Sequence, residues 1–329
     1  MPGLHSGIAT TIAVVLAFTK AVEAVVQREW VHFDSSGISL AAHLYVPETN
    51  SSVPRPAIVV GHPHGGVKEQ TAGLYARQIA ERTGFITLAF DAAYQGESGG
   101  MPRYLEDPYQ RADDARNAVT YLSTLDIVDA ERIGALGVCA SGGYVPFAAQ
   151  TDKRMKAVAT VSGIDLGTLY SEGMGSFDGP MLPGLASQLA EAGRQRVNEA
   201  NGARPNLTRI FPQTVADVLP SLPVFYQESY YYYQTPRGHV DTAPNWHLWR
   251  SLDMIATYRS YAFMNLISPR PLLMIAGADA DTLYFSQKAI EIAEEPKELY
   301  LVPGMTHIDL YDHTNVSVPK LVDFFTTHL

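Results

Sequence analysis

The segment most informative about the fold is Arg132-Ile-Gly-Ala-Leu-Gly-Val-Cys-Ala-Ser-Gly-Gly-Tyr144. An apolar run over residues 133–138 has the length of one buried strand, and a helix is expected over residues 141–150. Cys139 lies between the two, with small residues two positions before and after it. This spacing is typical of a nucleophile elbow. In such a sharp turn, the nucleophile is lifted above the sheet, and backbone N–H groups at a helix N-terminus point at a developing oxyanion.

A second register fits the same segment. Ser141 could be the nucleophile, with Cys139 and Gly143 as its small flanking residues. We favour Cys139, flanked by Gly137 and Ser141, because the apolar run ends at Val138 and the elbow residue should follow directly. A free cysteine is also a common buried core residue. The assignment therefore depends on whether the chain supplies a base, an acid and a second oxyanion donor.

The composition indicates a large globular protein. The chain has 329 residues, of which 46% are hydrophobic and 18% charged, so it can bury a large core. Its net charge of −10 and the lack of a Lys/Arg cluster speak against a nucleic-acid partner. A single cysteine excludes an internal disulfide framework. We expect a cytoplasmic protein, with secretion as the alternative. No nucleotide fingerprint or metal motif is present, so we expect no cofactor.

The first residues form a separate unit. Apolar residues recur at helical spacing between Ile8 and Val26, which predicts an amphipathic N-terminal helical extension over residues 1–28. The continuous apolar stretch from Ile8 to Phe18 is too short to span a bilayer, so we expect no stable membrane insertion. Such a helix would pack on the body of the protein or on a second subunit, and the latter would form a homodimer.

The remaining chain alternates strands with helices. Strands are expected over residues 29–33, 39–46, 56–61, 86–91, 133–138, 156–162, 271–276 and 298–302, and helices over residues 69–82, 108–125, 141–150, 285–294 and 318–328. The first two strands read as a hairpin. This alternation predicts an α/β fold with a mostly parallel sheet flanked by helices. Residues 29–165 and 268–329 would form this core, and residues 166–267 a cap or lid inserted between the sixth and seventh sheet strands.

The base and the acid are expected after the last two strands. His307 follows the final strand, where an imidazole can reach over the sheet and take a proton from the nucleophile. The preceding strand ends in Gly277-Ala-Asp-Ala-Asp281, where a carboxylate could hold the imidazole tautomer and stabilise the imidazolium. We favour Asp281 for this role, with Asp279 as the alternative because aspartate often serves only to form a turn.

The second oxyanion donor is expected in the loop His62-Pro-His-Gly-Gly66, which follows a buried strand. The glycines let the backbone approach a substrate closely. Pro63 has no N–H group, so we expect the backbone N–H of His64, or that of Gly65, to act beside the backbone N–H of Ala140. The two histidines of this loop lack a third ligand at a metal spacing, which disfavours a metal site.

Five motifs together resemble those of the α/β-hydrolase superfamily. They are residues 61–70 (GHPHGGVKEQ), 90–100 (FDAAYQGESGG), 137–144 (GVCASGGY), 268–277 (SPRPLLMIAG) and 304–307 (GMTH). The resemblance runs from about Val31 to His328. It is strongest to the dienelactone-hydrolase-like branch, which includes uncharacterised bacterial hydrolases and fungal polyketide transferases and hydrolases. It implies a triad of Cys139, Asp281 and His307, although most of the superfamily has serine where Cys139 stands and glycine where Ser141 stands.

A cysteine nucleophile restricts the substrate class. Thiolates form readily beside a histidine, but they are also good leaving groups, which favours thioesters, lactones and activated esters over amides. The aromatic residues of the expected cap could line an apolar substrate pocket; alternatively they form the core of the cap itself. The residues that we expect in the pocket are Tyr94, Tyr230, Trp246 and Trp249.

The sequence therefore predicts an enzyme. The leading hypothesis is a hydrolase that cleaves an ester, lactone or thioester of a hydrophobic, polyketide-like acyl group through a cysteinyl acyl-enzyme. One alternative is an acyltransferase that passes the acyl chain to an alcohol or amine. Another is a non-catalytic binding or cyclisation protein that uses the cap pocket alone. The expected partner is a small-molecule acyl substrate, either free or bound to a carrier protein.

Overall fold

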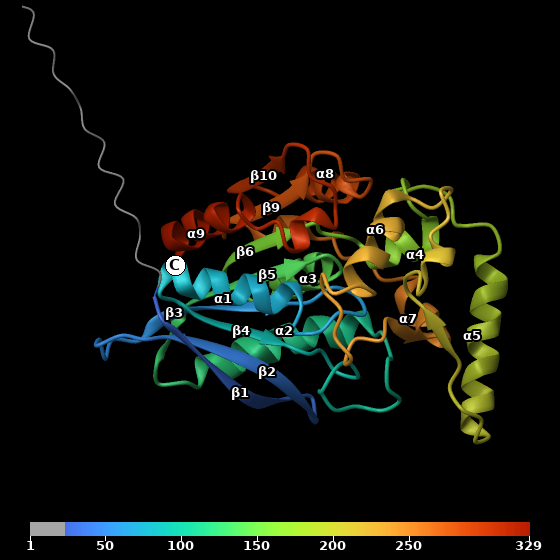
Figure 1. Ribbon diagram of the computed structural model, residues 1–329, viewed down its shortest axis with the longest axis horizontal. Helices are drawn as coiled ribbons and strands as arrows, with labels where there is room; N and C mark the ends of the chain where they lie inside the picture. The colour runs from blue at the N-terminus through green and yellow to red at the C-terminus, as the bar shows by residue number, and fades with distance from the viewer. Residues whose placement is uncertain (1–23) are drawn as a thin grey trace, which may run out of the picture.

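A computed structural model describes residues 24–329, and an eight-stranded sheet forms its centre (Figure 1). The order of the strands across the sheet is β1-β2-β4-β3-β5-β6-β9-β10. The strands are β1 Val26–Ser35, β2 Ile38–Pro47, β3 Arg55–Gly61, β4 Ile86–Phe90, β5 Val128–Val138, β6 Met155–Val161, β9 Leu272–Gly277 and β10 Lys297–Val302.

Only β2 runs against the other strands of the sheet. The β1–β2 hairpin turns at Ser36 and Gly37, which both have positive φ, as the twist of a tight hairpin requires. β2 pairs antiparallel with β4, and every later pair is parallel. The predicted hairpin and the predicted mostly parallel sheet are confirmed.

Five helices cover the sheet. They are α1 Thr71–Thr83, α2 Pro108–Ser123, α3 Ser141–Thr151, α8 Leu283–Ile292 and α9 Ser317–His328. The chain moves one way across the sheet from β3 to β4 and the opposite way from β4 to β5, and crossovers between parallel strands are right-handed. α1 and α2 therefore lie on opposite faces. α9 packs against α1, and α3 packs against α2.

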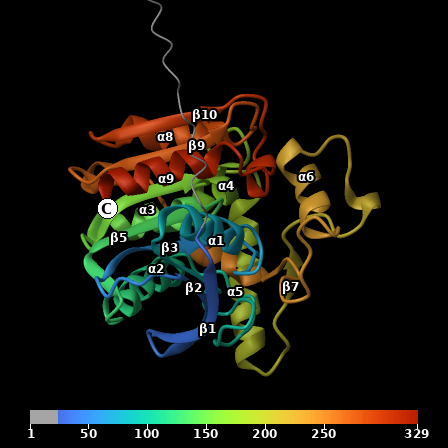
Figure 2. The same ribbon diagram turned by 60° about the vertical axis from the view of Figure 1, so that its left-hand side comes forward.

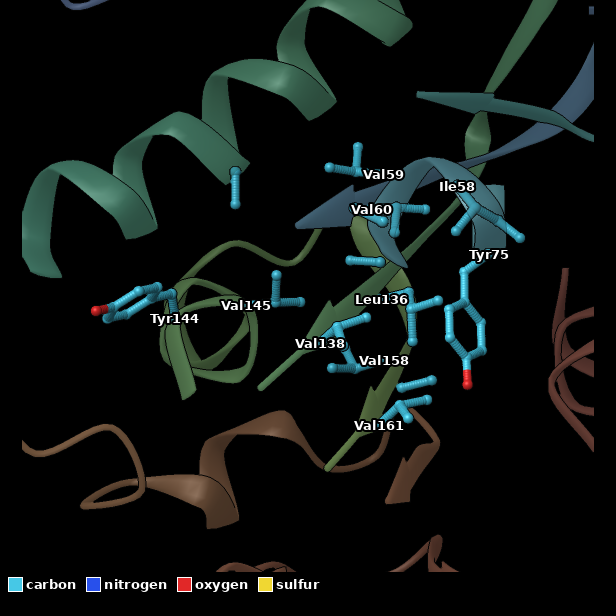
Figure 3. Close-up of a cluster of buried hydrophobic side chains, with 14 of the residues drawn as sticks. Ile58, Val59, Val60, Tyr75, Leu136, Val138, Tyr144, Val145, Val158 and Val161 are labelled. Carbon is cyan, nitrogen blue, oxygen red and sulfur yellow. The ribbon is translucent and has the colours of Figure 1, made fainter. Parts of the chain in front are cut away.

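The core forms where the central strands meet the covering helices. Figure 3 shows side chains from β3, β5 and β6, such as Val60, Leu136 and Val158, packed together with Tyr75 of α1 and Tyr144 of α3. Strands buried on both faces have nearly continuous apolar sequences, which explains why the central strands could be located from the sequence.

The segment between β6 and β9 adds no strand to the main sheet. It contains α4 Leu166–Glu172, α5 Leu185–Ala200, β7 Leu207–Arg209, η1 Val215–Asp217, α6 Val224–Tyr233, β8 Trp246–Leu248, η2 Trp249–Ser251, α7 Leu252–Ile255 and η3 Met264–Ile267. β7 and β8 form a separate two-stranded sheet. We call residues 166–267 the inserted segment. Figure 1 shows its helices α4 to α7 gathered at one end of the sheet, and Figure 2 shows α6 standing apart from the sheet.

One predicted boundary needs correction. β1 begins at Val26, so residues 26–28 belong to the hairpin and not to an N-terminal helical extension. The strand pairs with β2 from its first residue, because Val26 lies opposite Pro47. Residues 24–25 precede this strand without regular structure, and residues 1–23 of the predicted extension lie outside the described residues.

Candidate active site

The turn after β5 is centred on Cys139. This residue has φ 55°, a conformation that non-glycine residues adopt rarely and mostly where surrounding structure enforces it. A side chain at Gly137 is impossible in this turn, because an added Cβ would lie 1.9 Å from the backbone oxygen of Ser141. Cys139 is therefore the residue at the apex, between β5 and α3.

Ser141 has a different place in the turn. It is the first residue of α3, and its buried hydroxyl donates a hydrogen bond of 2.5 Å to the backbone oxygen of His62. The Ser141 side chain thus fastens the elbow to the loop after β3. An added Cβ at Gly61 would lie 2.8 Å from the Ser141 Cβ, so these two backbones approach closely.

The Cys139 thiol is surrounded by hydrogen-bond donors. Burial raises its pKa to about 11, although three groups lower it by hydrogen bonding: the Tyr311 hydroxyl and the backbone N–H groups of Ala140 and His64. The thiol is therefore protonated at neutral pH. β3 and β5 are neighbours in the sheet, with Gly61 opposite Gly137, so the loops that follow them converge on one point. Strand order reverses here, and ligands of open α/β sheets bind at such reversals.

His307 has polar contacts on both ring nitrogens. Its Nδ1 lies 2.6 Å from Thr282 Oγ1, and its Nε2 lies 3.4 Å from the Tyr311 hydroxyl oxygen. Burial lowers the pKa of His307 to about 3, so the imidazole is neutral. When Nδ1–H donates to the Thr282 oxygen, Nε2 keeps a lone pair that faces the Tyr311 hydroxyl. Tyr311 thus contacts both the thiol and the imidazole.

The structure does not bring the predicted acids to His307. The Asp281 carboxylate accepts a hydrogen bond of 3.0 Å from the backbone N–H of Phe225, in the first turn of α6. The first N–H groups of a helix lack partners inside the helix, and a carboxylate satisfies them well. Asp279 is exposed on the loop. Thr282, the next residue along the chain, occupies the position that we expected Asp281 to fill.

Two neighbouring cavities lie in this part of the structure, and the smaller one contacts the thiol. An inner cavity of about 20 Å³, roughly the space of one water molecule, contacts Cys139 and His64. An outer cavity of about 250 Å³ lies in the inserted segment. Both are lined by Tyr170, Ile210 and Tyr226, so these three side chains separate the cavities. The other residues of the inner cavity are Ile164, Leu166, Leu169, Phe211 and Phe225.

Only one of the four predicted pocket residues lines either of these two cavities. Trp249 lines the outer cavity. Within residues 24–329, Tyr94, Tyr230 and Trp246 line neither this cavity nor the inner one. The position along the axis of α6 explains one of these differences. Phe225 and Tyr226, near the start of that helix, face the cavity, whereas Tyr230 lies one turn further along.

Several residues of the site were not predicted from the sequence. Thr282 lies next to the carboxylate that we favoured, so only a fixed loop conformation could identify it. Tyr311 follows His307 by four residues in the short helix η4 Asp309–Tyr311, and this spacing offered a weak signal. Tyr170 and Ile210 come from the inserted segment, where sequence patterns gave no position.

Residues 24–329 contain neither a metal-binding cluster nor a membrane-spanning helix. No group of three or more His, Cys, Asp or Glu side chains there is arranged to hold a metal ion. None of the helices in the same range combines the length and apolar character needed to cross a membrane.

The sheet order and the strained turn after β5 place the protein among the α/β hydrolases. The chain belongs to the X-Pro dipeptidyl-peptidase (S15) family, whose model matches residues 36–252. Its similarity to the uncharacterized protein PA2218 of Pseudomonas aeruginosa is 39% identity over 298 residues, 89% of this chain and 78% of the relative. The crystal structure of PA2218 superimposes with a TM-score of 0.86, covering 98% of this chain and 100% of that one.

Two other relatives extend the comparison. The chain is 39% identical to the uncharacterized protein YcjY of Escherichia coli over 294 residues, 88% of this chain and 94% of the relative. It is 26% identical to the thiohydrolase aneE of Aspergillus aculeatus over 291 residues, 85% of this chain and 83% of the relative. These similarities confirm the α/β-hydrolase resemblance expected from the sequence, including its bacterial and fungal branch.

Proposed function

We propose that the protein hydrolyses esters, lactones or thioesters of hydrophobic acyl groups through a covalent acyl-enzyme on Cys139. One observation carries this proposal: the thiol lies at the apex of the elbow, and two backbone N–H groups and the Tyr311 hydroxyl point at it. The inner cavity beside it is lined mainly by apolar side chains. A carbonyl carbon placed on the sulfur would bring its oxygen near the N–H groups of Ala140 and His64, as an oxyanion hole requires.

Acylation would begin from neutral partners. The Cys139 thiol gives its proton to Nε2 of His307, directly or through the Tyr311 hydroxyl, as the sulfur attacks the carbonyl carbon. The resulting tetrahedral intermediate carries its negative charge on the former carbonyl oxygen. When it collapses, the bond to the leaving group breaks, and the imidazolium proton passes to that group. Thr282 keeps Nδ1 oriented throughout.

Deacylation would reverse these roles. Water gives a proton to His307 as it attacks the thioester carbon, and the sulfur leaves and is reprotonated. Collapse of a tetrahedral intermediate favours loss of sulfur over loss of an amide nitrogen, so peptide bonds are poor substrates for this site. The substrate class that we propose therefore differs from the peptidase activity in the family's name.

Acyl transfer is the second candidate. Cys139 is 1% exposed, and the inner cavity has room for about one water molecule. A site this dry would favour an alcohol or amine acceptor that fills the outer cavity. The acyl donor could be free or attached to a carrier protein. Product analysis with and without added alcohol separates hydrolysis from transfer.

The test is intact-protein mass spectrometry after mixing with a short-chain p-nitrophenyl ester and, separately, with an acyl thioester. Wild type is compared with Cys139→Ala and with Ser141→Ala as the matched elbow variant. We expect an acyl adduct in wild type and in Ser141→Ala and none in Cys139→Ala. An adduct that persists in Cys139→Ala but disappears in Ser141→Ala would refute the assignment of the nucleophile.

A further inference from the structure

Three rings lie at the boundary between the two cavities. The ring centroids of His64 and His247 are 5.1 Å apart, those of His64 and Tyr170 are 6.1 Å apart, and those of Tyr170 and His247 are 5.7 Å apart. His64 lines the inner cavity, His247 lines the outer one, and Tyr170 lines both. His64 comes from the loop after β3, whereas His247 comes from β8 in the inserted segment, so the contact joins the two parts of the molecule.

These histidines carry unused hydrogen-bonding atoms. His64 is 3% exposed and His247 4% exposed. Among the described residues, neither His64 Nε2 nor His247 Nδ1 has a hydrogen-bond partner, although both atoms are buried. Buried polar atoms are nearly always paired in folded proteins, so an unpaired one calls for an explanation. The two unpaired atoms belong to rings in contact, and each ring lines a cavity. We infer that a polar group of a ligand forms the missing hydrogen bonds.

The carboxylate of Glu106 lies close to the imidazole of His64. Glu106 is fully buried, and its Oε1 accepts a hydrogen bond of 2.7 Å from the Tyr144 hydroxyl. Its other oxygen, Oε2, lies 3.9 Å from His64 Nε2 and has no hydrogen-bond partner of its own among the described residues. At 3.9 Å these two atoms are too far apart for a hydrogen bond, so Nε2 of His64 and Oε2 of Glu106 both remain unpaired.

Both imidazoles are uncharged. Burial lowers the pKa of His64 to about 3, helped by the positive charge of Arg111, and burial lowers that of His247 to about 3. A neutral imidazole neither attracts an anion by charge nor repels a cation. It offers one acceptor and one donor, which match a hydroxyl group.

We propose that His64 and His247 form a subsite for a hydroxyl group on the acyl chain of the substrate, at the boundary between the two cavities. This rests on the proposed function, since it places the acyl chain in the cavities above Cys139. The subsite would select a chain hydroxylated at one position over the same chain without a hydroxyl. An apolar cavity alone cannot make that distinction, whereas a site that must satisfy buried polar atoms rejects the analogue that lacks the hydroxyl.

The experiment measures binding, so it does not depend on turnover. Dissociation constants are determined by ligand-observed NMR for decanamide and for a series of decanamides that each carry one hydroxyl at a different chain position. For wild type we expect one position to bind about fivefold to tenfold more tightly than decanamide, the gain of one hydrogen bond between neutral groups.

Three variants test whether the subsite causes that binding preference. His247→Phe keeps a ring of similar size and should abolish the preference, whereas His247→Gln keeps a hydrogen-bonding side chain and should retain part of it. His239→Phe is the matched control, because His239 is an exposed histidine of the same segment and lines neither cavity. Each preference is a ratio within one protein, so loss of folded protein in a variant does not change it.

Two results would overturn the subsite. One is equal binding of every hydroxylated decanamide and of decanamide by wild type. The other is a preference of the same size in wild type and His247→Phe. Neither result depends on the acyl adduct at Cys139, so the subsite and the proposed reaction can fail separately.

Discussion

Replacing Thr282 with valine tests how His307 is held. Valine has nearly the shape of threonine but cannot bond Nδ1, which lies 2.6 Å from the Thr282 hydroxyl oxygen. Thr282 is the N-cap residue of α8, yet its side chain makes no capping hydrogen bond, so its removal should leave the helix intact. The substitution should therefore remove the hydrogen bond to the imidazole without destabilising the fold.

The expected loss follows from burial. His307 is fully buried, so Nδ1 would be left without a partner at a cost of about 1–3 kcal/mol. Each 1.36 kcal/mol corresponds to a tenfold change in rate, which gives a decrease of about 5- to 150-fold in the acylation rate. A carboxylate in this position would be worth more, because it stabilises the imidazolium by charge as well as by orientation.

The assay is stopped-flow acylation with a p-nitrophenyl ester, comparing wild type with Thr282→Val. Asp281→Asn is the matched control, since asparagine keeps an acceptor for the Phe225 N–H while removing the charge. We expect the control to stay within about threefold of wild type, as its hydrogen bond is retained. A larger loss in Asp281→Asn than in Thr282→Val would refute this reasoning and restore Asp281 as the triad acid.

Three further changes test the surroundings of the thiol. Tyr311→Phe removes a hydroxyl that lowers the pKa of Cys139, so alkylation by iodoacetamide at fixed pH should slow by about tenfold; an unchanged rate would contradict the contact. Gly137→Ala would place a Cβ 1.9 Å from the Ser141 oxygen; urea unfolding should show a loss of more than about 2 kcal/mol, and a loss below about 0.5 kcal/mol would disprove the close approach. Three buried histidines have pKa values lowered to about 3, whereas histidines of the unfolded chain titrate near 6.5, so each contributes stability that is complete above pH 6.5 and is lost towards pH 3 by up to about 1.4 kcal/mol per pH unit; urea midpoints that stay constant from pH 7 to pH 4 would exclude this. These histidines are His64, His247 and His307.

The centre of the sheet could be predicted from the sequence because its central strands are buried on both faces. Runs such as 133–138 and 272–277 are apolar throughout, and each is followed by small or turn-forming residues. The elbow could be located for a related reason. A strained turn tolerates only small flanking residues. Because the close contact with Ser141 leaves no room for a side chain at position 137, glycine is required there, and this glycine is visible in the sequence.

The partner of His307 could not be predicted because the choice depends on a few ångströms of loop. Asp281 and Thr282 are adjacent in the loop after β9, and from that loop either side chain could reach the imidazole of His307. The choice is made by α6, whose unpaired N–H at Phe225 takes the carboxylate. That helix belongs to the inserted segment, whose short elements and irregular connections leave few periodic signals. The residues that line the cavities were hard to locate for the same reason.

The use of threonine in place of a carboxylate is consistent with a thiol nucleophile. A serine alkoxide is so basic that its formation depends on a strongly supported imidazolium, whereas a thiolate is intrinsically more stable. In this site the thiolate would be stabilised further by the Tyr311 hydroxyl and by the two backbone N–H groups at the elbow. The imidazole then needs orientation more than charge, and a hydroxyl group at Nδ1 supplies it. In the proposed reaction, a cysteine at the apex and the redirection of Asp281 towards α6 would thus be two parts of one arrangement.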